Sequence, residues 1–290
     1  MESSQSNQLL FLRSSDGRDE GNGTYNFHLN NPLQARRGNR IMCELAEAEI
    51  PCSFYNFTNE NNFLKFETFV IFNGSTNYNI DVSFTIPEKN YTISELQDLV
   101  NNKTDRRTFG NGEEYELRLE YDPQTLKIEF KILFGGYTGN PNNKIDAPFK
   151  IHQDSTAAGI LGLSLDDYCV VADSEQTARF IGTKAINLHR TMNVYVRTNL
   201  QLTNVDAKGE MSGILAKVQV DKPFGEIVHY HNIEKIRFLI ADKFVDNIQI
   251  VLETDDGRAL DFNGLDFHLT LAFFYVKEQL QTYVETLHDK

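Results

Sequence analysis

Tryptophan is absent from this 290-residue chain, and cysteine occurs only three times. The three cysteines, Cys43, Cys52 and Cys169, show none of the paired spacings that zinc sites or dithiol redox sites require. Free cysteine is among the residue types most often buried in protein cores. We therefore expect all three to be reduced residues of the core.

Long apolar runs are also missing, most clearly near the N-terminus. Residues 1–23 contain no basic segment followed by a sustained apolar stretch. Neither a secretory signal nor a membrane-spanning segment is therefore predicted. The expectation is a protein made and kept in a reducing compartment.

Positive charge is scarce, with 28 Lys and Arg against 41 Asp and Glu, a net charge of -13 and a pI of about 5.0. Such a surface repels phosphate backbones except at a local basic patch. Basic residues gather at Arg36, Arg37 and Arg40 and at Arg106–Arg107. Solvated arginines are the simpler interpretation, with contact to an acidic neighbour or nucleic acid as the alternative. Nucleic-acid binding is not predicted.

Phenylalanine and tyrosine are abundant, at 21 and 12 residues, which favours pleated surfaces over helical bundles. Many segments alternate apolar and polar residues, as half-buried strands do. These segments are 24–30, 39–50, 63–72, 77–86, 115–133, 192–200, 213–220, 225–230, 247–254 and 266–275. The dipeptides Asn73-Gly74, Asp122-Pro123 and Asp256-Gly257 suit tight turns, so they predict three hairpins, the last of which ends the fold.

Two segments depart from strand patterning and predict short helices. Residues 90–104 carry apolar side chains on one helical face, with Thr92 or Ser94 as the N-cap. Residues 154–163 have Asp154 or Ser155 as a cap, although two glycines weaken this helix. The C-terminal residues 277–290 fit a short amphipathic helix packed on the protein, a disordered tail or a partner-binding element.

The predicted fold is all-β, an antiparallel jelly-roll β-sandwich with two short helices and a probable insertion. A parallel α/β fold would need a helix between nearly every pair of strands. The predicted domains are an N-terminal arm at 1–23, a jelly-roll domain at 24–276 with a possible insertion at 92–190, and a tail at 277–290.

Candidate chemical sites are weak. His229 and His231 would share one face of a strand, as a metal pair requires, but no third ligand follows from the sequence. An acidic loop at 166–175 lacks the order of an EF-hand, and the Gly-rich segment 134–143 lacks the Lys-Ser/Thr of a phosphate-binding loop. No nucleophile elbow is present. The sequence therefore predicts neither catalytic residues nor a bound metal or other cofactor.

The order of several segments along residues 24–276 is more informative. They are IPCSFY at 50–55, IPEKNYT at 86–92 followed by Glu95-Leu96, YDPQTLKIEF at 121–130, ILGL at 160–163, and the closing stretches 214–230 and 247–275. This order resembles the penton, or vertex capsid, proteins of polinton-like viruses, virophages and related eukaryotic double-stranded DNA viruses. The resemblance implies a virion protein whose jelly-roll subunits form pentamers at the icosahedral vertices. It also implies as partners a double jelly-roll major capsid protein and other minor capsid proteins.

The candidate partner-binding residues are Leu9, Leu10, Phe11 and Leu12, an apolar patch in an otherwise polar N-terminal segment. The alternative is that they pack on their own domain. Replacing all four by Ser is expected to impair assembly more than folding. Other functions left open are a minor capsid or cement protein and a jelly-roll glycan-binding module that uses exposed Tyr and Asp, with or without calcium. A hydrolase on a β-sandwich is disfavoured because no carboxylate pair or metal triad follows from spacing.

Overall fold

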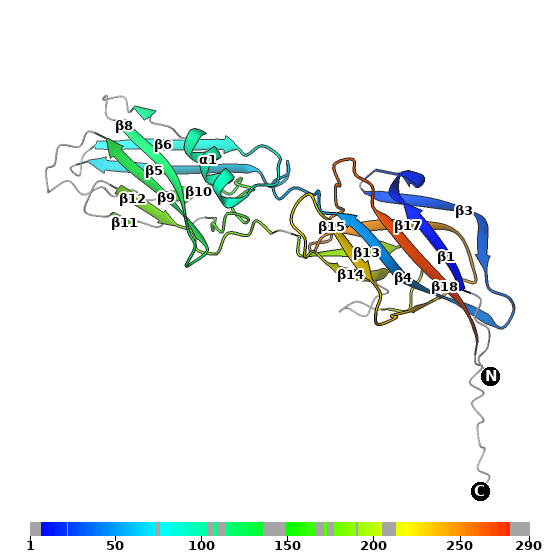
Figure 1. Ribbon diagram of the computed structural model, residues 1–290. Helices are drawn as coiled ribbons and strands as arrows, with labels where there is room; N and C mark the ends of the chain where they lie inside the picture. The colour runs from blue at the N-terminus through cyan, green and yellow to red at the C-terminus, as the bar shows by residue number, and fades with distance from the viewer. Residues whose placement is uncertain are drawn as a thin grey trace, which may run out of the picture. The chain divides into compact units, whose positions relative to one another are not determined.

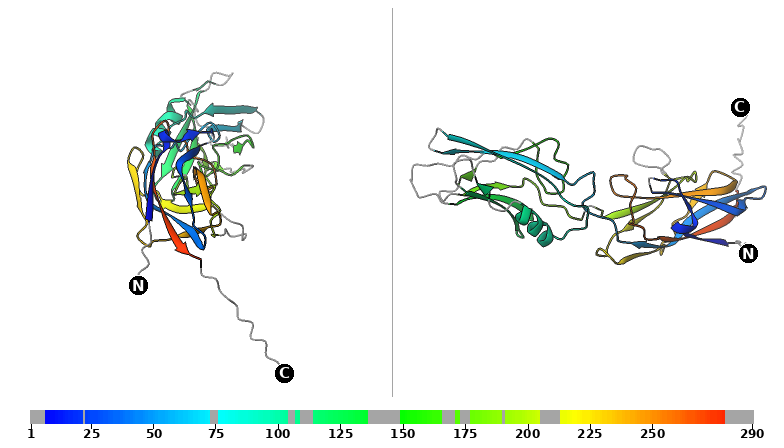
Figure 2. Two further views of the ribbon diagram at one scale, coloured as in Figure 1. Left: turned by 90° about the vertical axis from the view of Figure 1, so that its right-hand side faces the viewer. Right: turned by 90° about the horizontal axis from the view of Figure 1, so that it is seen from above.

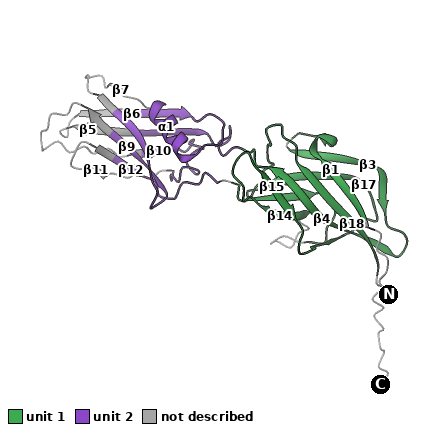
Figure 3. Cartoon of the chain, viewed as in Figure 1, with its two compact units in different colours: residues 1–54, 191–290 green, residues 55–190 purple. Residues whose placement is uncertain are grey.

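The computed structural model divides the chain into two compact units, shown in different colours in Figure 3. Unit 1 consists of residues 1–54 and 191–290, and unit 2 consists of residues 55–190. The structure describes residues 7–21, 23–72, 76–103, 107–108, 114–135, 149–165, 171–172, 177–189, 191–204 and 213–278. Within these residues every strand pair is antiparallel and α1 is the only α-helix.

Unit 1 contains two sheets, whose strands are labelled in Figure 1. The first sheet has the order β1 (Asn7–Arg13), β18 (His268–Lys277), β4 (Asn39–Pro51) and β15 (Ile227–His231), with β16 (Phe238–Ile240) also paired to β4. The second sheet has the order β14 (Ile214–Gln219), β13 (Asn193–Thr198), β17 (Phe244–Glu253), β3 (Thr24–Gln34) and β2 (Arg18–Asp19).

The pairing of these strands is nested. If the short β2 and β16 are left aside, the first strand in the chain pairs with the last (β1 with β18) and the second with the seventh (β3 with β17). The third pairs with the sixth (β4 with β15) and the fourth with the fifth (β13 with β14). A hairpin of four nested pairs, folded over so that the pairs alternate between two sheets, is a jelly roll. The predicted all-β jelly-roll class is confirmed.

The alternation of buried and more exposed side chains along the strands explains why unit 1 forms a sandwich. Val194 and Val196 on β13 are buried, and their neighbours along the strand are only partly buried. On β18 the side chains of Leu269, Leu271 and Phe273 lie in the same core cluster. One face of each sheet therefore turns toward the other sheet, and burial of these faces is the main force that holds the two layers together.

Unit 2 is a second β-sandwich with its own core (Figure 2). One sheet is β10 (Phe149–Ile151), β5 (Phe63–Phe72) and β6 (Thr76–Thr85); the other is β11 (Val171–Ala172), β12 (Thr177–Ile181), β9 (Lys127–Gly135), β8 (Glu114–Asp122) and β7 (Arg107–Thr108). Phe66 on β5 and Phe130 on β9 are fully buried, and their ring centroids lie 5.3 Å apart. These aromatic contacts join the two sheets. The predicted hairpins β5–β6 and β8–β9 are confirmed.

Helix α1 (Ile93–Lys103) begins with a capping box. The Thr92 hydroxyl accepts a hydrogen bond from the backbone N–H of Glu95 (3.3 Å), and the Glu95 carboxylate accepts one from the backbone N–H of Thr92 (2.9 Å). Leu96 and Val100 then face the core of unit 2. Of the two caps predicted from the sequence, Thr92 is the one used. No helix in the described residues is long and apolar enough to cross a membrane.

The second predicted helix is wrong, because residues 154–163 form turns. Gly162 has a positive φ of 70°, which a continuing right-handed helix does not allow. A Cβ atom at this position would lie 2.3 Å from the backbone oxygen of Lys184. The close approach of two backbone segments therefore explains both the glycine and the end of the helical pattern.

The predicted C-terminal hairpin is also wrong. Asp256-Gly257 does form a tight turn, with φ of 78° at Gly257 and a bridge between Glu253 and Ala259. The strands that flank it, β17 and β18, nevertheless belong to different sheets. The turn therefore reverses the chain locally before the chain crosses to the other layer.

Two boundaries differ from those predicted, the one after the N-terminal arm and the one at the start of the insertion, whereas the predicted end of the insertion at residue 190 agrees with the end of unit 2. The segment 1–23, expected to be an arm, contains β1 and β2, and β1 pairs with β18 over its whole length. The second unit begins at Tyr55, not near residue 92. Of the expected tail 277–290, Glu278 is bound by Arg40 (2.9 Å) and Lys243 (3.1 Å). The predictions for Cys169, for the acidic loop, for most of 134–143 and for residues 279–290 lie outside the described residues.

Candidate interaction surface

Strand β1 distributes the four candidate residues over two faces. Leu12 is buried in the core of unit 1 and Leu10 packs against that core, whereas Leu9 is 54% exposed and Phe11 72% exposed. This separation follows from the alternation of side chains along a strand. Replacing all four residues would therefore disturb the core as well as the surface. Leu9 and Phe11 remain as the exposed apolar residues of this strand.

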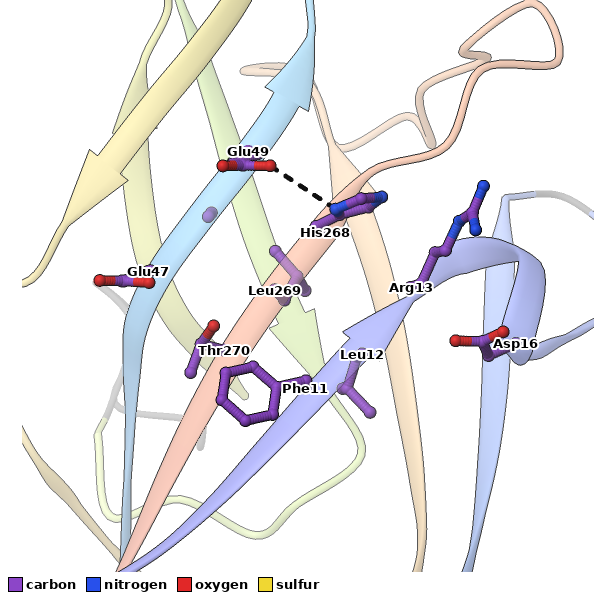
Figure 4. A pocket seen from close by; sticks show the side chains of 10 residues that line it. Phe11, Leu12, Arg13, Asp16, Glu47, Glu49, His268, Leu269 and Thr270 are labelled. Atoms are coloured by element: carbon purple, nitrogen blue, oxygen red, sulfur yellow. Dashed lines mark ion pairs between the residues drawn. The ribbon is translucent and has the colours of Figure 1, made fainter.

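Phe11 lies beside a shallow groove on the outer face of the first sheet (Figure 4). The groove has a volume of about 380 Å³ and is formed by β1, β18 and β4 together with Asp16. Phe11 is its most exposed apolar residue, and its polar side carries Glu47 and Glu49 from β4 and His268 from β18. An open groove lined by both apolar and charged residues suits a protein or sugar surface better than an enclosed small molecule.

Two cross-strand rows organise the charges on this face. One row runs Arg13, His268, Glu49 and His229 across the four strands, and the next runs Phe11, Thr270, Glu47 and His231. Each histidine faces a carboxylate: His268 lies 3.5 Å from Glu49, His229 lies 4.0 Å from Glu49 and His231 lies 3.6 Å from Glu47.

The sequence correctly placed His229 and His231 on one face of a strand. Their partners, however, are two separate glutamates. Among the described residues no group of three or more His, Cys, Asp or Glu side chains could hold a metal ion. All of these side chains are more than half exposed, so water and salt screen any attraction between them strongly. They make the face polar.

The end of β1 is fixed by a carboxylate outside the sheet. Asp266 accepts hydrogen bonds from Ser14 Oγ (2.7 Å) and Arg13 Nε (3.0 Å). The hydrogen bond from Ser14, assisted by Arg13, lowers the pKa of Asp266 below its ordinary value. Ser14 also accepts a hydrogen bond from the backbone N–H of Phe267 (3.2 Å), so the two strands are linked just beyond their ladder.

The other half of the outer face is covered by Arg237. Its guanidinium lies 3.7 Å from the ring centroid of Phe274, and its Nε donates to Glu44 (2.7 Å). Phe274 and Glu44 are both buried although they face away from the core cluster. The accessible part of the face is therefore the half that carries Phe11, Glu47 and Glu49.

The sequence missed Arg13, Glu47, Glu49 and His268 as parts of one surface. Glu47 and Glu49 alternate with buried Ala48 and Ile50, which is a visible signal. The same period does not extend back to Glu44, because the register with β18 shifts next to Ala46. A β-bulge of this kind has no clear signature in a single sequence.

No protein-family model matches the sequence, and no curated protein matches it either. Among solved structures, the chain is similar to a crystal structure of the mavirus penton protein. The TM-score is 0.49 and the sequence identity is 11%, with 93% of this chain and 100% of that chain covered.

Proposed function

We propose that the chain is a structural capsid protein, the penton that forms the pentameric capsomer at the vertices of an icosahedral virion. The observation that carries this proposal is the nested jelly roll of unit 1, with a second β-sandwich inserted between its third and fourth strands. Fold alone does not determine function. The order of sequence segments, which resembles penton proteins, directs the choice among jelly-roll functions.

Physical features of the surface support an assembly role. A ring requires two different patches on each subunit, because a rotation that closes on itself joins one patch to the other. Unit 1 has exposed apolar residues on both edge strands of its first sheet, Leu9 and Phe11 on β1 and Ile227 on β15. Burial of such residues between copies stabilises an oligomer without a chemical step.

In this proposal the pentamer contacts a double jelly-roll major capsid protein and other minor capsid proteins around the vertex. Among the described cysteines, Cys43 and Cys52 are buried, and burial raises the pKa of both thiols. Neither is suited to act as a nucleophile at neutral pH.

The test is native mass spectrometry and electron microscopy of the purified chain over a range of concentrations, alone and with a candidate double jelly-roll major capsid protein. Fivefold rings, or density for the chain at the vertices of assembled particles, support the proposal. A monomer in both conditions contradicts it. In that case a glycan array, read with and without a calcium chelator, tests the glycan-binding alternative.

A further inference from the structure

We propose that the subunits of this ring join edge to edge, with β1 of one copy paired antiparallel to β15 of the next. The first sheet of unit 1 then continues from copy to copy. The inference rests on the proposed function, because it takes the partner of this surface to be a second copy of the same chain. It goes further by naming the two strands that meet.

The edges of the two sheets in unit 1 differ in how they are protected. An exposed edge strand invites pairing with another chain unless it is very short, bulged, or carries proline or lysine. In the second sheet, β2 has only two residues, and β14 carries Lys217 and shows a register shift with β13 at Val196/Arg197. Both edges of the second sheet are therefore protected.

The edge strands β1 and β15 of the first sheet lack these protective features. Strand β1 has seven residues, no proline or lysine, and an unbroken register with β18 from Asn7 to Arg13. Strand β15 has five residues, no proline or lysine, and an unbroken register with β4. Among the described strands each pairs on one side only. Two open edges on one sheet are what a continuous sheet across copies requires.

The directions of β1 and β15 also allow a continuous sheet across copies. The order β1–β18–β4–β15 is antiparallel at each step, so β1 and β15 run in opposite directions. A second copy placed beside the first in the same orientation brings its β1 next to β15. These two strands are then antiparallel, and the ladder continues with the spacing of about 4.8 Å that sheets have.

The faces of the two strands also match. Leu12 and Val228 point into the core, so Phe11 lies on the same outer face as Ile227 and His229. A shift by one residue would place an outward-facing residue of one strand opposite a core-facing residue of the other, which limits the junction to registers that preserve this match. Within these registers Phe11, 72% exposed, packs against Ile227 or His229 of the next copy.

A closed ring requires this head-to-tail junction and not a two-fold contact between two β1 strands, because a ring joins two different patches on each subunit. A two-fold dimer through β1 would occupy the edge that the ring needs.

Disulfide trapping tests the junction directly. Within one copy β1 and β15 are three strand spacings apart, about 14 Å, so no disulfide can link them. The test variants are Phe11→Cys with His229→Cys and Phe11→Cys with Ile227→Cys, which cover the two registers. The control is Arg18→Cys with Lys217→Cys, on exposed positions of the second sheet's edges. Every variant also carries Cys169→Ser, while Cys43 and Cys52 stay because they are buried.

Native mass is measured before oxidation, and denatured mass without reductant is measured after it. We expect pentamers of the unmodified chain and of the control, pentamers of the two test pairs at raised concentration, and a covalent ladder ending at the pentamer in at least one β1–β15 pair but not in the control. Pentamers that give no ladder in either pair overturn the edge-to-edge inference and leave the proposed function standing. A disulfide-linked dimer of a variant that carries Phe11→Cys alone shows a two-fold β1 contact and also overturns it. Absence of pentamers in the unmodified chain and in the control before oxidation refutes the proposed function itself.

Discussion

The adjacent residues Phe11 and Leu12 of β1 should contribute very differently to the stability of unit 1. Phe11 is the larger side chain, but 72% of it is exposed, whereas Leu12 is only 5% exposed and belongs to the core of unit 1. We therefore predict that Leu12→Ala destabilises unit 1 strongly. Phe11→Ala should destabilise it clearly less, although it removes more atoms.

The magnitudes follow from burial. Truncation of a buried leucine to alanine costs 2–5 kcal/mol, so about 3 kcal/mol is expected for Leu12→Ala. For a domain of this size that corresponds to a fall in Tm of about 6–12 °C. A fully buried aromatic side chain removes 150–250 Å² from water, and about a quarter of that, roughly 40–60 Å², applies to Phe11, so at about 25 cal/mol per Å² its truncation costs about 1–1.5 kcal/mol.

The assay is thermal and urea unfolding at a concentration low enough that the chain is monomeric, because oligomerisation adds to apparent stability by mass action. The same two variants are then compared by native mass at high concentration. Under the proposed assembly, Phe11→Ala weakens the pentamer. Equal losses of Tm in the two variants would refute the two-faced placement of β1.

Four further predictions concern residues away from this surface. Thr92→Ala should destabilise unit 2 by about 1 kcal/mol through loss of the helix cap, which urea unfolding measures. The hydrogen bond from Lys89 lowers the pKa of Glu95 to about 2. The ionised Glu95 carboxylate therefore stabilises unit 2 above pH 4.5, and this stabilisation is lost as the pH falls toward 2. Glu95→Gln should make the stability depend less on pH in acid-unfolding curves. Gly162→Ala should cost more than about 2 kcal/mol, because the residue needs a positive φ and its Cβ would meet a backbone oxygen; a soluble variant with unchanged Tm would contradict the tight approach. Cys43 should resist a thiol reagent in the native state and react only on unfolding, because burial raises the pKa of its thiol.

Local patterns in the sequence predicted most of the individual strands but not all of their partners. The alternation around Val194 and Val196 and the turn at Asp122 depend on neighbouring residues, so a single sequence contains the signal. The turn at Asp256-Gly257 is equally local, and it was predicted correctly as a turn. Whether the strands on either side pair with each other depends on contacts far away in the chain, which no local pattern encodes.

The candidate surface shows the same division. The apolar run Leu9–Leu12 was visible as a patch, but four consecutive apolar residues do not show the alternation that distinguishes a half-buried strand from an arm. Only pairing with β18 assigns Leu12 to the core and Phe11 to the surface. The charged residues that share the groove come from three strands, so their proximity depends on the nested topology.

The insertion joins unit 1 at interior strands of its two sheets, and not at the edge strands of the first sheet. Strand β4 is flanked by β18 and β15, and β13 is flanked by β17 and β14, so the chain leaves and re-enters unit 1 from interior strands of both sheets. The entropy cost of a connection grows only slowly with its length, and an inserted unit with its own core adds no disorder to the loop. The edge strands β1 and β15 have no direct connection to the insertion. In the proposed ring the strands that join the copies are therefore separated along the chain from the insertion.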